Sequence, residues 1–148
     1  QIYIAAASGN WSDEASYVRI HPPWWRMSLS ASGITALHVA IIMEQSSFVE
    51  KLVDRMNLQD LEIRMADGNT AFCLAAITGN VKISEILLGK SPRLLRIRGQ
   101  KDMLPIQLAS SVGHIPMTEF LFQKTPKNQP LDKDMLKLFF LTIDNNIY

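Results

Sequence analysis

The residues of this chain that are best suited to chemistry are its three histidines and its single cysteine. A histidine such as His38 could act as a general base, and Cys73 could act as a nucleophile, if a partner group stood beside it. No serine, cysteine or aspartate is placed to complete a catalytic triad with His38. The scattered histidines and Cys73 also lack the ligand spacing of a zinc site. The sequence therefore predicts no catalytic residue, no metal ligand and no cofactor.

His38 and Cys73 also occupy the same position of a repeated segment, and Gln107 occupies that position in a third copy. A catalytic residue would not be expected to vary among equivalent positions in this way. We therefore interpret Cys73 as a small packed residue. No glycine-rich phosphate loop is recognisable, because Gly33 and Gly68 belong to the repeated segment.

The repeated segment is the main organising feature of the chain. Gly33-Ile-Thr-Ala-Leu-His-Val-Ala40 returns as Gly68-Asn-Thr-Ala-Phe-Cys-Leu-Ala75 and, more distantly, as Asp102-Met-Leu-Pro-Ile-Gln-Leu-Ala109. The closing alanines are 35 and 34 residues apart, and Ala5 precedes Ala40 by 35. A fixed period of this length is typical of stacked helical repeats. Such arrays are binding surfaces and are rarely catalysts.

Each repeat predicts two helices. The first begins after Thr35 or Thr70, which can cap exposed N–H groups, and ends at Gly9, Gly79 or Gly113, with Glu44 in the equivalent place. The second is amphipathic, and we expect it over residues 48–56, 81–88 and 116–122. Extended polar stretches are expected over 60–67 and 94–101. On the second helix of its repeat, Ser84 is expected to face away from any binding surface and to tolerate a charge.

The composition is that of a globular domain without an obvious charged partner. The chain has 148 residues, of which 47% are hydrophobic and 20% charged, and its net charge is +1. This balance gives no reason to expect a nucleic acid or an acidic membrane surface as a partner. A single cysteine suits a reducing compartment such as the cytoplasm, and no uncharged apolar run approaches the length of a membrane span. The missing initial Met suggests a fragment of a longer protein.

The turn, the Thr-Ala-Leu-His-x-Ala motif, the Gly-Asn pair and the following apolar helix together resemble the ankyrin repeat. The resemblance implies an all-α solenoid in a single domain, 1–148, with repeats at about 1–32, 33–67, 68–101 and 102–134 and a partial repeat at 135–148. More narrowly, residues 67–76 and 97–105 resemble plant ankyrin-repeat proteins with a C-terminal membrane domain of the PGG type. That narrower resemblance implies a parent chain at the cytosolic face of a membrane.

Ankyrin repeats bind partners through their loop fingers and the exposed side of each first helix. The resemblance therefore implies a protein-binding surface on the concave face of the solenoid. The residues carried over to this surface are Ile34, Ile42, Met43, Asn69, Ile77, Thr78, Gln100, Lys101, Met103 and Val112. Several of them are apolar, and an exposed apolar strip usually marks an interface. The alternative is that the parent protein covers the strip itself.

These features favour a non-enzymatic domain that binds a protein partner or a second copy of itself, without a nucleic acid or a small-molecule substrate. The alternative is the cytosolic regulatory domain of a plant membrane signalling or channel-like protein, active in stress or immune responses. Two readings also remain for Trp24 and Trp25. They either pack on the first helix pair or form an exposed anchor for a partner.

Overall fold

The computed structural model describes residues 2–11 and 24–125, and all structural statements below concern these residues. They form helices and short 3₁₀ turns, and no strand occurs among them. The all-α class predicted from the sequence is therefore confirmed. In chain order the elements are α1 (Ile2–Ser8), η2 (Trp24–Arg26), α2 (Ala36–Ile42), α3 (Ser46–Arg55), η3 (Asp60–Glu62), α4 (Ala71–Thr78), α5 (Val81–Lys90), η4 (Pro92–Arg96), η5 (Gln100–Asp102), α6 (Pro105–Ser111) and α7 (Ile115–Lys124).

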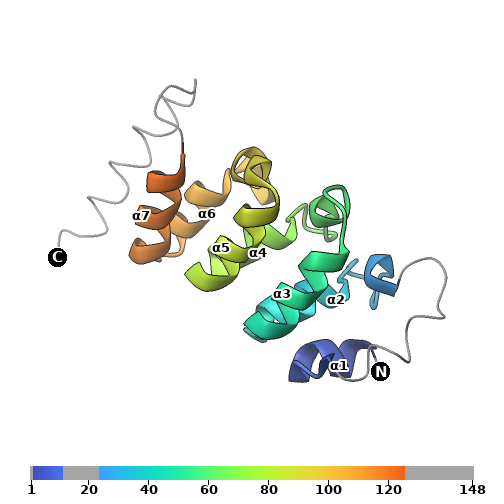
Figure 1. The fold of residues 1–148 in the computed structure, drawn as a ribbon. Helices are drawn as coiled ribbons and strands as arrows, with labels where there is room; N and C mark the ends of the chain where they lie inside the picture. Colours follow the sequence, from blue (N-terminus) through green and yellow to red (C-terminus); the bar gives the residue numbers. More distant parts are fainter. Residues whose placement is uncertain (1, 12–23, 126–148) are drawn as a thin grey trace.

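The helices stack in two layers (Figure 1). The first helices α1, α2, α4 and α6 contact one another in that order, and the second helices α3, α5 and α7 form the other layer. Small residues let the first helices approach closely, because Ala36, Ala40, Ala75 and Ala109 are completely buried between them. The core is continuous along the stack rather than divided among repeats.

The ends of the first helices follow the predicted signals. At the start of α4, Thr70 Oγ1 accepts a hydrogen bond from the backbone N–H of Cys73 at 3.3 Å. Gly79, at the end of α4, has a φ of +77°, in the left-handed region where glycine lacks the Cβ clash. Glu44 takes the equivalent place after α2 and adopts a φ of +57°. The second repeat therefore contains a strained residue where its neighbours have glycine.

The second helices begin slightly earlier than predicted at two of their three positions. The helix expected from residue 48 begins at Ser46, and that expected from 116 begins at Ile115, whereas α5 begins at Val81 as predicted. Asn80 caps α5, because its Oδ1 accepts the backbone N–H of Ile83 at 3.0 Å. The apolar stripes of the three second helices face the core, as the amphipathic pattern indicated.

The connections between helix pairs were predicted as extended polar stretches, and this was wrong in part. Leu61 in η3 and Leu94 in η4 are fully buried beneath the stack. Both segments contain a short 3₁₀ turn rather than extended chain throughout. Each turn places its leucine in the core, where the side chain adds buried apolar area.

Trp24 and Trp25 pack against the stack, which is the first of the two readings. Trp24 is only 3% exposed and lies against Trp11, with 6.2 Å between ring centroids. Trp25 donates its Nε1–H to Asp60 Oδ2 at 2.9 Å, and Arg26 Nε bonds the other carboxylate oxygen at 2.6 Å. Burial alone raises the pKa of Asp60, but hydrogen bonds from Arg26, Asn57 and Trp25 outweigh it and lower the pKa below 3.8. This buried carboxylate ties η2 to η3.

Residues 1 and 12–23 of the predicted first repeat, the end of the fourth repeat and the partial repeat at 135–148 lie outside the described residues. The repeat boundaries therefore remain predictions. Within the described ranges, no helix has the length and apolar content needed to cross a bilayer.

Candidate protein-binding surface

Three loops that precede the first helices form closed fingers. Each is closed by one backbone hydrogen bond: Leu29 to Ile34 at 2.7 Å, Met65 to Asn69 at 2.9 Å, and Gly99 to Met103 at 2.8 Å, with the first residue donating its N–H each time. We use the term finger surface for these three loops together with the exposed C-terminal ends of α2, α4 and α6. All ten predicted binding residues lie on these elements.

Hydrogen bonds also connect neighbouring fingers. The backbone N–H of Ala66 donates to the carbonyl of Ser32 at 2.8 Å. Arg64 Nη1 bonds the carbonyls of Gly68 at 2.7 Å and Arg98 at 2.6 Å, one in its own finger and one in the next. These bonds hold the fingers in register, so that a partner would meet a preformed row of loops.

Asn69 departs from the expectation of a binding position, because its side chain is only 1% exposed. Its Oδ1 accepts the backbone N–H of Gln100 at 2.8 Å, and its Nδ2 bonds Asp67 and the Gln100 side chain at 3.2 Å each. The side chain is already used to join two fingers. A partner could not touch it directly, and its role is to position Gln100.

The other predicted binding residues reach the surface to different degrees. Ile42, Met43 and Val112 are 45%, 51% and 49% exposed, so each presents a large apolar side chain to solvent. Lys101 is also exposed. The remaining five are half-buried, and Ile34 packs partly against the core: Ile34, Ile77, Thr78, Gln100 and Met103.

The third finger carries unusual backbone strain. Lys101 and Asp102 both have positive φ, at 55° and 57°, whereas Gly33 and Gly68 occupy the left-handed turn position in the other fingers. A non-glycine residue in this region costs about 1–2 kcal/mol. Backbone strain of this kind is common at functional sites, which makes the tip of the third finger a candidate functional position.

His38 has a structural role at the base of its finger. Its Nδ1 accepts the backbone N–H of Thr35 at 3.0 Å and lies 2.8 Å from Thr35 Oγ1, so the ring proton must sit on Nε2. The Nε2 atom is buried, and no described residue accepts a well-formed hydrogen bond from it. Burial lowers the pKa of His38 from 6.5 to about 4, although the Ile63 carbonyl and the charge on Asp67 oppose the change.

The equivalent residues show that this position is used for packing and turn closure. Gln107 Oε1 accepts the backbone N–H of Leu104 at 2.8 Å, as His38 does for Thr35. Cys73 is completely buried, and this burial raises the pKa of its thiol despite hydrogen bonds with Thr70. A buried, protonated thiol is a poor nucleophile. In the described part of the chain, no three His, Cys, Asp or Glu side chains gather as a metal site would require.

Comparison with known proteins decides the family. A family model described as "Ankyrin repeats (3 copies)" matches residues 37–134, which is more than half of the chain. This chain belongs to the ankyrin-repeat family. Ankyrin repeats generally mediate protein–protein interaction, and the family is typically not enzymatic.

Two curated proteins illustrate the relationship. The "BTB/POZ domain-containing protein 1" of Schizosaccharomyces pombe is 33% identical over 82 residues, covering 54% of this chain and 6% of that protein. The "Ankyrin repeat and KH domain-containing protein mask" of Drosophila melanogaster is 30% identical over 66 residues, covering 45% of this chain and 2% of that protein. The chain thus spans only a small part of these relatives. Neither they nor the family match support the narrower resemblance to plant proteins with a PGG domain.

Sequence reasoning missed two features of this ankyrin domain. One is the buried Asp60 cluster, and the other is a groove between α5 and α7, which is described below. Asp60 gave no signal because an acid in a polar stretch is normally exposed. The positions in the groove could have been found by comparing the outward residues of successive second helices.

Proposed function

We propose that this domain is a non-enzymatic interaction module that binds a protein partner through the finger surface, on the concave side of the ankyrin stack. The observation that carries the proposal is the exposure of Ile42, Met43 and Val112 at the ends of α2 and α6. Each of these two helices directly follows one of the hydrogen-bonded fingers. A rigid row of loops beside exposed apolar side chains suits recognition of another protein surface, because little order is lost on binding.

The partner is either another protein or a second copy of this chain, in the cytoplasm or at the cytosolic face of a membrane. Methionine side chains such as Met43 and Met103 adapt to different partner shapes, which fits either case. We assign no small-molecule substrate and no nucleic acid to the surface.

Affinity capture with the immobilised domain, followed by mass spectrometry, tests this function. The matched baits are the wild-type domain, a Met43→Glu/Val112→Glu double variant and a Lys82→Glu variant that changes an exposed residue of α5. We expect proteins, or untagged copies of the chain, that bind the wild-type and Lys82→Glu baits and are lost from the double variant. Identical captured sets for all three baits would contradict binding through the finger surface.

A second candidate rests on the resemblance of residues 67–76 and 97–105 to plant ankyrin proteins with a membrane domain. In this case the domain would transmit a signal to a membrane-embedded part of the same protein during stress or immune responses. The parent transcript tests this directly. Four apolar stretches of about 20 residues would support it, and their absence would leave the interaction module alone.

A further inference from the structure

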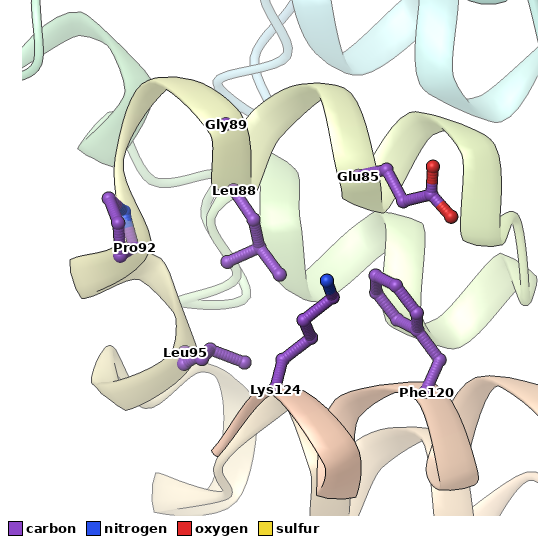
Figure 2. Close-up of a pocket in the computed structure, with 7 residues that line it drawn as sticks. All are labelled: Glu85, Leu88, Gly89, Pro92, Leu95, Phe120 and Lys124. Atoms are coloured by element: carbon purple, nitrogen blue, oxygen red, sulfur yellow. The ribbon is translucent and has the colours of Figure 1, made fainter. Parts of the chain in front are cut away.

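A groove lies between the second helices α5 and α7, in the layer away from the finger surface. It has a volume of about 500 Å³ and opens to solvent. This is within the range of sites that bind small molecules or single side chains. Figure 2 shows Leu88 of α5 and Phe120 and Lys124 of α7 directed toward the same space, with Leu95 of η4 at one side. The lining residues are Glu85, Leu88, Gly89, Pro92, Leu95, Phe120 and Lys124.

The groove departs from the pattern of the preceding second helix. Counting along the repeat, Phe120 stands where α3 has the exposed Lys51, and Gly89 stands where α3 has the exposed Asp54. Two positions that are charged on α3 thus hold a phenylalanine on α7 and a glycine on α5. This change creates a partly apolar surface where a repeat protein needs only a solvated face.

Gly89 is not required by the fold of α5. Its φ is not positive, and a Cβ added there would meet no atom within 4 Å. Glycine in a helix is less favourable than a residue with a side chain, so Gly89 destabilises α5. No contact among the described residues requires a glycine at this position. A bare helix backbone at a groove wall is explained if another chain approaches it closely.

The charges at the groove indicate what that chain carries. Lys124 Nζ lies 5.6 Å from the centre of the Phe120 ring, and no described carboxylate forms an ion pair with it. Glu85 lines the groove from α5 and is also exposed, but it is not within ion-pair distance of Lys124. An incoming acidic group would be attracted to Lys124, whereas an apolar side chain would fit among Leu88, Leu95 and Phe120.

We propose that the α5–α7 groove is a second docking site, which binds a short peptide segment of a partner protein with a large apolar side chain next to an acidic residue. The apolar side chain occupies the space beside Gly89, and the acid bonds Lys124. This site is independent of the finger surface, so the domain can bind two protein segments at once.

Chemical-shift titration of the isotope-labelled 148-residue chain tests the proposal. The probe is the capped tripeptide acetyl-Asp-Leu-Phe-amide, and acetyl-Lys-Leu-Phe-amide is its charge-reversed control. The protein variants are Lys124→Glu, the matched exposed change Lys82→Glu on α5, and Gly89→Gln, which places a side chain at the groove wall as in Gln123 of α7.

For the wild type, we expect shifts at Leu88, Gly89, Leu95 and Phe120, with the acidic peptide bound about tenfold more tightly than the basic one, the scale of a favourable charge pair. Lys124→Glu should reverse this preference, and Lys82→Glu should keep it. Gly89→Gln should melt at or above the wild-type temperature and lose binding. A finger-surface variant, Met43→Glu, should bind the peptide normally.

Three results would overturn the proposal. The first is no shift at these residues at millimolar peptide, and the second is an equal preference in Lys124→Glu and the wild type. The third is contact in the free protein between Leu88 or Phe120 and side chains of residues 126–148, because the chain would then fill its own groove. None of these results would affect the function proposed for the finger surface.

Discussion

At the residue scale, His38 shows how a residue that could do chemistry can stabilise the fold. Its neutral ring closes the turn at Thr35, and its burial makes protonation costly in the folded state. The same position holds Cys73 and Gln107 in later repeats, which could be recognised from the sequence because equivalent positions can be compared along one chain.

The pKa of His38 leads to a pH prediction. The folded pKa of about 4 lies below the ordinary value of 6.5, so the unfolded chain binds the proton more readily between these values. The free energy of unfolding should therefore fall as the pH is lowered from 7 to 5, by about 2 kcal/mol from this residue. Urea unfolding at both pH values measures the change.

His38→Gln is the matched control for this measurement, because Gln107 closes the equivalent turn. The variant should lose roughly 0.5–1.5 kcal/mol at pH 7, the scale of one hydrogen bond. It should also lack the His38 part of the decrease toward pH 5. An unchanged pH dependence in the variant would show that His38 is not the residue that titrates.

At the element scale, the helix ends and fingers follow the repeat closely. Glu44 stands where α4 is followed by Gly79 and α6 by Gly113, and all three adopt a left-handed φ. The left-handed backbone conformation at this place is therefore set by the repeat and not by the residue type.

Glu44→Gly should stabilise the domain by about 1 kcal/mol, because glycine removes the Cβ clash of the left-handed conformation. Thermal and urea unfolding provide the measurement. The converse changes give a graded control. Gly113→Ala should lose about 1 kcal/mol from strain alone, since its added Cβ meets no atom within 4 Å. Gly79→Ala should lose more, because its Cβ would lie 2.9 Å from the His114 ring. Destabilisation by Glu44→Gly would show that the left-handed turn is not what limits α2.

Side-chain burial was harder to predict than helix position. Ser84 was expected to tolerate a charge, yet it is completely buried and lies 3.6 Å from Met117 Sδ. Its equivalents Val49 and Thr118 are also buried, so the second helices have a wider buried stripe than their apolar residues indicate. Asn69 misled for a related reason: a polar residue in a loop can be buried when another finger satisfies its hydrogen bonds.

At the scale of the whole molecule, stability depends on close contact between successive first helices. Ala75 lies in α4, which packs against both α2 and α6, and its side chain is completely buried. Ala75→Leu should therefore overpack two repeats at once and lose roughly 1–3 kcal/mol. Wild-type thermal stability for this variant would contradict the close stacking. Ile77→Leu, at a half-buried position of the same helix, is the control and should lose less stability.

The all-α class and the stacked repeat could be predicted from the sequence because they depend on spacing, which one chain displays several times. For the candidate binding surface, the sequence could indicate which residues belong to it but not how far each side chain is exposed. Ile77 is half-buried rather than fully exposed, so a charge there would disturb packing as well as binding. Met43 and Val112 are the better test positions, since about half of each side chain is exposed.

The most direct test of the central claim is a paired measurement of stability and partner affinity for Met43→Glu, Val112→Glu and Lys82→Glu, with a captured partner as ligand. All three should unfold within about 0.5 kcal/mol of the wild type, because the changed residues are exposed. The first two should weaken binding by about tenfold to a hundredfold or more, since a charge buried against an apolar partner is costly unless paired. Lys82→Glu should bind as the wild type does. Stable Met43→Glu and Val112→Glu variants with unchanged affinity would contradict binding through the finger surface.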